Sequence, residues 1–165
     1  METDLTYSMD DTIKTIGLIS DTHGLLRNSA VDALSDVDII LHAGDIDRMI
    51  VIDELELTAP VRAVRGNMDF KAEVRALPDY LEIKAWERTI GVIHNRHHLG
   101  ADPAAWGLSV VVHGHTHMPA IDETGGVLYV NPGSAGPARP NRPVTVAILK
   151  LKNGHVVPEI ITIEA

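Results

Sequence analysis

Hydrophobic positions along the chain fall into short, nearly continuous runs separated by polar or amphipathic segments. Five early runs indicate β-strands: TIGLIS (15–20), VDIILHA (37–43), VRAVRG (61–66), TIGVIH (89–94) and LSVVVHG (108–114). Runs of this kind are typical of strands that are covered on both faces. We therefore expect these strands to lie inside a layered structure.

Two segments between these strands, residues 26–36 and 47–57, have the spacing of amphipathic helices. After about residue 120 the pattern changes to the runs VLYVN, TVAILKL and VVPEIITIEA, separated by Gly, Pro and Asn. These runs predict antiparallel strands joined by turns. The whole pattern predicts an α/β fold with βαβ units first and a β-rich second half.

Length and composition indicate one globular domain in the 165-residue chain, of which 45% is hydrophobic. We expect residues 15–165 to form this domain, and the acidic residues 1–14 to be a partly disordered extension without the basic start of a secretory signal. No hydrophobic run approaches the roughly 18 residues of a membrane span. The absence of cysteine removes disulfides and thiolate ligands, and it fits the reducing cytoplasm, where we expect the protein.

The net charge of −9 limits the partners that the surface can bind. Proteins that bind long nucleic acids usually present a basic face, whereas the Lys and Arg residues here are scattered. We expect no extended nucleic-acid surface and no membrane partner. A small phosphate ester still suits the chain if bound metal ions supply positive charge locally. The sequence leaves a homo-oligomer open.

Each of the five early strands is followed by a residue that can bind a metal ion. In chain order these segments are Asp21-Thr22-His23-Gly24, Gly44-Asp45, Gly66-Asn67-Met68-Asp69, His94-Asn95 and His113-Gly114-His115-Thr116-His117. In open α/β sheets, functional groups gather at the carboxyl ends of strands. Carboxylate, imidazole and amide donors suit Mn²⁺, Fe²⁺, Zn²⁺ or Ni²⁺. A carboxylate can also bridge two cations that activate a shared water for attack on phosphorus.

Taken singly, these motifs have simpler interpretations. Asp-x-His, Gly-Asp and Gly-Asn are common in polar turns, and a lone His94 would more often pack in a core. Gly-His-Thr-His is more informative, because two histidines two residues apart after a hydrophobic run seldom serve packing. The ordered set at five strand ends therefore favours a metal centre over five unrelated turns.

The series DTHG, GD, GN, H and GHTH over residues 16–118, followed by NPGSAGPAR (131–139), resembles the calcineurin-like metallophosphoesterase superfamily and its small single-domain phosphodiesterase branch. The resemblance implies a four-layer α/β/β/α sandwich with a dinuclear site at one sheet edge. It implies one cation held by Asp21, His23, Asp45 and His117, and a second held by Asp45, Asn67, His94 and His115. Asp45 is then the shared ligand. His113 falls outside this ligand set, in a supporting or packing role.

Two positions depart from the family pattern. Met68 stands where many relatives have a histidine that is thought to protonate the leaving group, and methionine has no proton to donate. This departure suggests dependence on a good leaving group, or on another acid such as His97 or a metal-bound water. Asn95 stands where glycine commonly follows the histidine ligand. Beside it, Arg96 and His97 are candidate contacts to substrate.

The expected function is a divalent-metal-dependent phosphodiesterase. It would hydrolyse P–O bonds of a small phosphodiester by attack of a hydroxide that bridges two metal ions, with Asp45 and Asn67 in the catalytic centre. We expect two divalent ions, foremost Mn²⁺, with Zn²⁺, Fe²⁺ or Ni²⁺ as alternatives.

The alternative function is a non-catalytic protein-interaction scaffold of the same fold, and the intact ligand set argues against it. A nuclease acting on DNA is a third interpretation, which the acidic charge and the expected single domain argue against. The natural substrate stays open among cyclic nucleotides, dinucleotides, glycerophosphodiesters and RNA ends.

Overall fold

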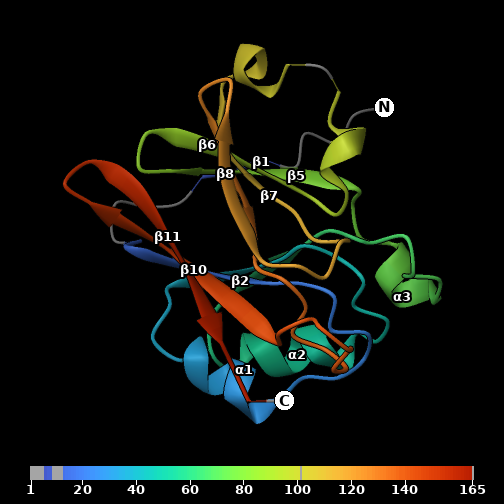
Figure 1. The fold of residues 1–165 in the computed structure, drawn as a ribbon. Helices are drawn as coiled ribbons and strands as arrows, with labels where there is room; N and C mark the ends of the chain where they lie inside the picture. The colour runs from blue at the N-terminus through green and yellow to red at the C-terminus, as the bar shows by residue number, and fades with distance from the viewer. Residues whose placement is uncertain (1–5, 9–12, 101, 165) are drawn as a thin grey trace.

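Two β-sheets pack face to face in the computed structural model, which describes residues 6–8, 13–100 and 102–164 (Figure 1). One sheet has five strands in the order β11-β10-β2-β3-β4. Their bounds are β2 (Thr15–Ile19), β3 (Ile39–His42), β4 (Val61–Ala63), β10 (Thr145–Lys152) and β11 (His155–Thr162). The other sheet has six strands in the order β1-β5-β6-β7-β9-β8. Their bounds are β1 (Thr6–Ser8), β5 (Tyr80–Ala85), β6 (Arg88–Ile93), β7 (Leu108–Val112), β8 (Ala120–Thr124) and β9 (Val127–Asn131).

Short helices flank the two sheets. They are α1 (Asn28–Ala33), α2 (Ile50–Glu56), α3 (Ala72–Arg75) and the 3₁₀ helices η1 (Arg96–His98) and η2 (Pro103–Trp106). The helices α1 and α2 lie against the five-stranded sheet, where Leu34 and Leu55 are buried with Ile40 (Figure 1). A separate cluster that includes Leu18 and Val112 fills the space between the sheets. The predicted four-layer sandwich is confirmed, although 3₁₀ helices form the layer beyond the six-stranded sheet.

Both predicted helical segments form helices, but shorter ones than residues 26–36 and 47–57. Helices of six or seven residues have little stability on their own in water. The helices α1 and α2 therefore depend on the burial of their hydrophobic faces against the sheet, which the cluster around Leu34 and Leu55 provides.

The five predicted strands are all present, as β2, β3, β4, β6 and β7. The prediction of a purely antiparallel second half is wrong for β9, because β9 pairs parallel with β7 and antiparallel only with β8. The strand β5 is absent from the predicted set. Hydrophobic and polar residues nevertheless alternate in its sequence, YLEIKA. In the structure Leu81, Ile83 and Ala85 are buried and the residues between them are more exposed.

The N-terminal segment is only partly described. The predicted disorder of residues 1–14 falls mainly outside the described residues, and it stays a prediction. Within the described ones, Thr6–Ser8 form β1, which pairs parallel with β5. None of the helices in the described part of the chain has the length and hydrophobicity to cross a membrane.

Candidate metal centre

The predicted ligands meet where the carboxyl ends of parallel strands from both sheets come together. The strands β2, β3 and β4 of one sheet run parallel, as do β6 and β7 of the other. Backbone hydrogen bonds join the loops that follow: Asp21 N–H donates to Gly44 O at 3.0 Å, and Gly114 N–H donates to His94 O at 3.0 Å. The five strand ends thus divide into three from one sheet and two from the other, which the linear order of motifs does not reveal.

Four of the predicted ligands form one compact group. Asp21, His23, Asp45 and His117 each offer an atom within 4.8 Å of the others. The Nε2 atoms of His23 and His117 are 3.3 Å apart, and His117 Nε2 lies 3.2 Å from Asp21 Oδ1. Donors around one cation at about 2.1 Å are about 3.0–3.4 Å from one another in octahedral or tetrahedral geometry. The spacing of these atoms therefore fits a divalent cation.

The hydrogen bonding of this group also fits a cation. Asp21 is fully buried, yet its Oδ1 has no hydrogen-bond partner among the described residues. A buried polar atom without a partner costs about 1–3 kcal/mol. The other oxygen, Oδ2, accepts from Ser20 Oγ–H at 2.7 Å and from His115 N–H at 3.2 Å. The carboxylate is thus fixed by one oxygen and presents the other toward the histidines.

A second group lies beside the first and shares Asp45 with it. Asn67 Oδ1 is 2.9 Å from His94 Nε2 and 3.0 Å from His115 Nδ1. Asp45 Oδ2 is 3.3 Å from His94 Nε2 and 3.9 Å from His23 Nε2. One carboxylate oxygen therefore faces histidines of both groups. All seven residues that the sequence singled out as metal ligands are thus brought to one place.

The charges of Asp45 and His94 stabilise each other. Burial alone would raise the pKa of Asp45, but the hydrogen bond and charge of His94 and the Met68 N–H hold it below its ordinary value. Burial alone would lower the pKa of His94, and Asp45 outweighs it, so that this pKa is raised. The carboxylate is therefore ionised at neutral pH, as a cation ligand must be.

Most of the predicted ligands have a backbone conformation that is unusual for their residue type. Positive φ angles occur at Asp21 (54°), His23 (46°), Asp45 (55°), His115 (72°) and His117 (60°). A non-glycine residue in this left-handed region costs roughly 1–2 kcal/mol. Such strain concentrates at functional sites, where the surrounding structure maintains it.

Polar residues outside the predicted set hold these loops in place. The Asp69 carboxylate accepts hydrogen bonds from the backbone N–H groups of Ile46 and Gly66, at 2.8 and 2.7 Å, and so ties together the loops that carry Asp45 and Asn67. A residue of this kind could have been suspected from the Gly-Asn-x-Asp spacing, but its partners come from a distant part of the chain.

Two further polar residues support the neighbouring loops. The amide Nδ2 of Asn131 donates to Gly114 O at 3.0 Å. His42 is fully buried; its Nδ1 accepts from Gly44 N–H at 3.2 Å, and its Nε2 lies 3.0 Å from Thr22 Oγ1. Burial lowers the pKa of His42 to about 3, so this ring is neutral and orients the turn that precedes Asp45.

His113 lies outside both groups. Its ring packs edge-on against Tyr129 on the outer face of the six-stranded sheet, with ring centroids 6.4 Å apart. Burial, followed by the nearby charge of Arg96, lowers the pKa of His113 to about 4. The Arg96 guanidinium donates to Asp122 at 2.8 Å and stacks over Tyr129 at 3.9 Å. A substrate phosphate would have to compete with Asp122 for Arg96. The contact of Arg96 with substrate stays a prediction.

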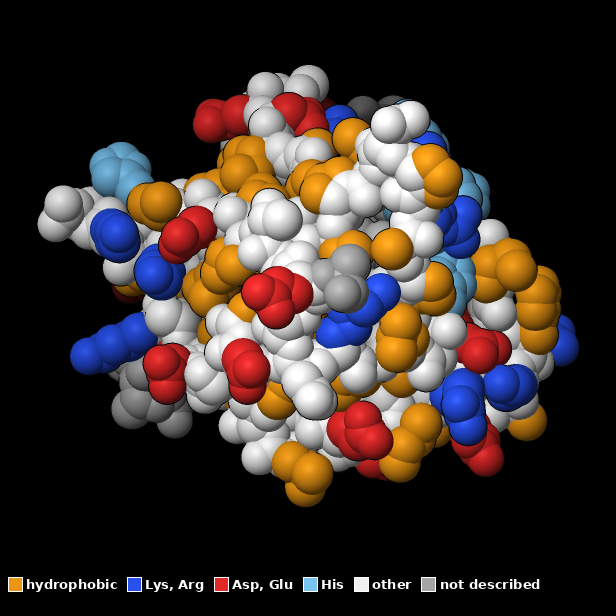
Figure 2. Space-filling view, turned by 60° about the horizontal axis from the view of Figure 1, so that its bottom comes forward, with side chains coloured by type: hydrophobic (Ala, Val, Ile, Leu, Met, Phe, Trp, Pro, Cys, Tyr) orange, Lys and Arg blue, Asp and Glu red, His pale blue; other side chains and the backbone are white. Residues whose placement is uncertain are grey.

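A cleft of about 650 Å³ opens beside the second group. Its lining includes Asn67, His94 and His115 of the second group, and also Arg65, Asp79, Tyr80, Ile93 and His98. Figure 2 shows histidine side chains on the right flank of the molecule, beside basic and hydrophobic ones. His97, the predicted substrate contact, is exposed and is not part of the cleft lining. Its neighbour His98 lines the cleft instead.

We expect Gly66→Ala to damage the site. A Cβ on Gly66 would lie 2.1 Å from Asp45 Oδ1 and 2.4 Å from Asp45 N, and the backbone cannot yield as a flexible side chain would. Overpacking of this kind costs about 1–3 kcal/mol. Thermal unfolding and metal titration of the variant should show lower stability and weaker cation binding. Phe70→Ala, an exposed position in the same loop, should leave both unchanged, and unaltered cation binding by Gly66→Ala would contradict the close approach.

Comparison with known proteins places this architecture in a family. A family model described as a calcineurin-like phosphoesterase superfamily domain matches residues 15–154. A probable metallophosphoesterase of Methanothermobacter thermautotrophicus is 36% identical over an alignment of length 159; the alignment covers 88% of this chain and 91% of that protein.

Solved structures agree with this match. An archaeal phosphodiesterase superposes with a TM-score of 0.75 at 25% identity, covering 89% of this chain and 99% of that one. Vps29 of Chaetomium thermophilum has a TM-score of 0.71 at 20% identity, covering 90% and 96%, which is a likeness of fold. With its family match extending over most of its length, the chain belongs to the calcineurin-like phosphoesterase superfamily.

Proposed function

We propose that this chain is a divalent-metal-dependent phosphodiesterase that uses two cations. The observation that carries the proposal is the pair of adjoining ligand groups that share Asp45. The names of the relatives support it, since they include a probable metallophosphoesterase and an archaeal phosphodiesterase. Metal dependence is a property of this family, and the donor set of carboxylate, imidazole and amide suits Mn²⁺ foremost, with Zn²⁺, Fe²⁺ or Ni²⁺ as alternatives.

Two cations bound by these groups would supply a hydroxide at neutral pH and positive charge to the phosphorus oxygens. The residues of the chain set where this happens. Asp45 is ionised and fixed by Met68 N–H at 2.8 Å, so its position between the two groups is defined. Asn67 contributes a neutral oxygen, which leaves the site with a mildly positive charge. A singly charged phosphodiester suits that charge better than a doubly charged monoester.

We expect the metal-loaded protein to cleave bis-p-nitrophenyl phosphate faster than p-nitrophenyl phosphate. The mild charge favours the diester, and both compounds release p-nitrophenolate, so leaving-group acidity does not explain a difference. The measurement is kcat/KM for each compound after removal of metal and reloading with Mn²⁺. Faster cleavage of the monoester would argue for a phosphomonoesterase.

The alternative, a protein-interaction scaffold of the same fold, rests on the likeness to Vps29, which is one of fold alone. The same experiment separates the two functions. If the protein binds Mn²⁺ at both groups and cleaves neither compound, the scaffold is favoured. If removal of metal abolishes turnover and Mn²⁺ restores it, the enzyme is favoured.

A further inference from the structure

The cleft next to Asn67, His94 and His115 raises the question of how a leaving group is protonated. The side chain that directly follows Asn67 is Met68, which is half-exposed and has no proton to give. An alkoxide or phenolate of high pKa leaves phosphorus slowly unless an acid supplies a proton. Any such acid must lie within reach of the bound ester, and the cleft is the space that adjoins the candidate ligands.

The titratable and charged groups that line the cleft can be compared one by one. Arg65 forms two hydrogen bonds with Asp79, of 2.5 and 2.8 Å, and a guanidinium does not release its proton. The Tyr80 hydroxyl donates to Glu82 at 2.8 Å. Burial, followed by this hydrogen bond, raises the pKa of Tyr80, which makes it a poor acid.

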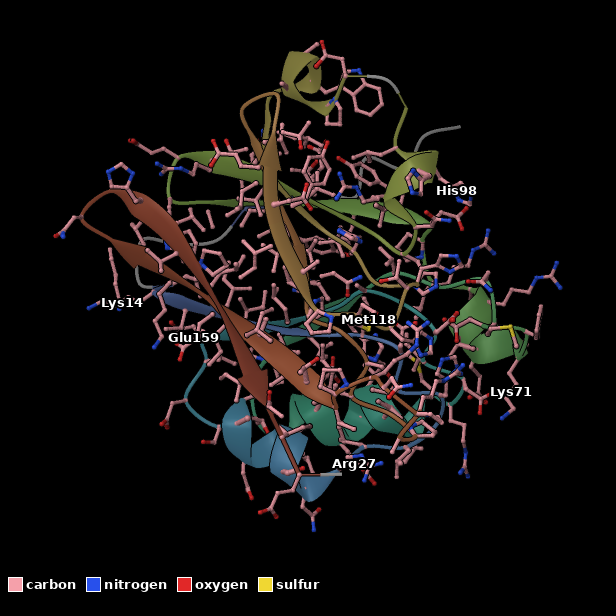
Figure 3. The ribbon with its side chains drawn as sticks, in the orientation of Figure 1. Lys14, Arg27, Lys71, His98, Met118 and Glu159 are labelled. Atoms are coloured by element: carbon pink, nitrogen blue, oxygen red, sulfur yellow. The ribbon has the colours of Figure 1, made fainter. Side chains whose placement is uncertain are left out.

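Among the described residues that line the cleft, the remaining candidate is His98. The other two histidines of the lining, His94 and His115, both lie against Asn67. The His98 ring has no hydrogen-bond partner in the described structure, and the side chain is exposed. It projects from η1 on the side of the molecule that carries α3 (Figure 3).

The local structure explains why His98, and not His97, faces the cleft. Successive side chains of a 3₁₀ helix point about 120° apart, so the two rings diverge. The side chain of Asn95 caps η1 by accepting a hydrogen bond from His97 N–H at 3.1 Å, and Asn95 O accepts from His98 N–H at 3.0 Å. The unusual Asn95 after the ligand His94 therefore fixes the orientation of the helix that presents His98.

We propose that the cleft holds the leaving group of a phosphodiester and that His98 protonates the leaving oxygen. This inference rests on the proposed function. Bound cations would supply the hydroxide from water, whose proton goes to solvent. Attack of that hydroxide would form the new P–O bond, the bond to the leaving oxygen would break with its electron pair on that oxygen, and an N–H proton of the His98 imidazolium would move to it. Neutral His98 then regains a proton from solvent. The net reaction is diester and water to monoester and alcohol.

The neighbouring charges suit this role. Asp79 lies on the cleft wall, and after the hydrogen bond and charge of Arg65, the charge of His98 helps to lower the pKa of Asp79. The carboxylate of Asp79 and the ring of His98 therefore lie close enough for their charges to interact. Asp79 is also paired with Arg65, so part of its negative charge is already balanced by the guanidinium.

The test is a series of methyl aryl phosphates whose phenols range from p-nitrophenol to unsubstituted phenol. With the Mn²⁺-loaded wild-type protein, kcat/KM should fall only gently as the phenol becomes less acidic. His98→Gln should cleave the p-nitrophenyl ester at nearly the wild-type rate and lose about 10²-fold or more on the phenyl ester. His97→Gln, the adjacent histidine outside the cleft, should follow the wild type across the series.

A binding measurement provides a readout independent of turnover. On adding methyl phenyl phosphate to protein loaded with Zn²⁺, which is diamagnetic, the His98 ring signals in the NMR spectrum, identified by their loss in His98→Gln, should shift, and those of His97 should not. If His98→Gln loses the same factor of kcat/KM on every ester, or if the His98 signal does not shift, the proposed role of His98 is wrong, while the proposed function is unaffected. Absence of all turnover by the wild type would remove the proposed function and this assignment with it.

Discussion

Replacing Asp45 by asparagine is expected to lower kcat/KM for bis-p-nitrophenyl phosphate by about 10³-fold or more. Loss of a residue that only hydrogen-bonds to a metal ligand typically costs less, roughly 10–100-fold. The reason for the larger loss is that Asp45 Oδ2 faces His94 Nε2 at 3.3 Å and His23 Nε2 at 3.9 Å, one in each ligand group. Asparagine keeps the size and can still accept from Met68 N–H, but it removes the negative charge shared by the two groups. Steady-state kinetics with saturating Mn²⁺, together with elemental analysis, measures the effect.

The matched control is Asp47→Asn. Asp47 lies two residues further along the same loop, is partly exposed, and its carboxylate pairs with Lys71 at 3.3 Å. It also has a positive φ of 68°, which asparagine tolerates. Activity close to wild type is expected. If Asp45→Asn hydrolyses the diester at the wild-type rate, the activity comes from another site or another protein.

The sequence predicts the chemistry of the site better than its architecture. Possible ligands follow five hydrophobic runs, and the carboxyl ends of parallel strands do meet at one edge, so a metal centre could be expected from the sequence. The choice of seven ligands among these residues is implied by the resemblance to the family. The division of the runs between two sheets has no local signature. The runs before Asp21 and His94 look alike, although one belongs to β2 and the other to β6.

Backbone conformation is the feature of the site that the residue types predict least well. Asp21, His23 and Asp45 adopt left-handed φ angles that their residue types disfavour. The hairpin between β5 and β6 turns at Trp86 and Glu87, both with positive φ (56° and 58°). Without the Asn-Gly or Asp-Gly pair that marks such turns, the strand β5 is easily overlooked.

The orientation of side chains around the cleft could not be predicted for a related reason. His97 and His98 are adjacent, and no periodic pattern is long enough in a three-residue 3₁₀ helix to tell them apart. Only the cap by Asn95 and the position of η1 on the sheet decide which ring reaches the cleft.

Among the three histidines of His113-Gly114-His115-Thr116-His117, we expect His115→Gln and His117→Gln each to weaken binding of one cation drastically, and His113→Gln to keep both. Gly114 packs so closely that a Cβ there would lie 2.0 Å from Ser20 Oγ. After it, His115 and His117 adopt φ angles of 72° and 60°, which turn one ring toward Asn67 and the other toward Asp21.

His113 precedes that turn and points to the opposite side of the sheet, onto Tyr129. Its replacement should therefore lower stability by about 1–3 kcal/mol through lost packing, with the cation stoichiometry unchanged. Manganese titration of the three Gln variants, with thermal unfolding of each beside it, measures both quantities. His113→Gln controls for the loss of an imidazole, since it differs from the other two only in position. Loss of one cation by a folded His113→Gln would require the ligand set to be redrawn with His113 inside it.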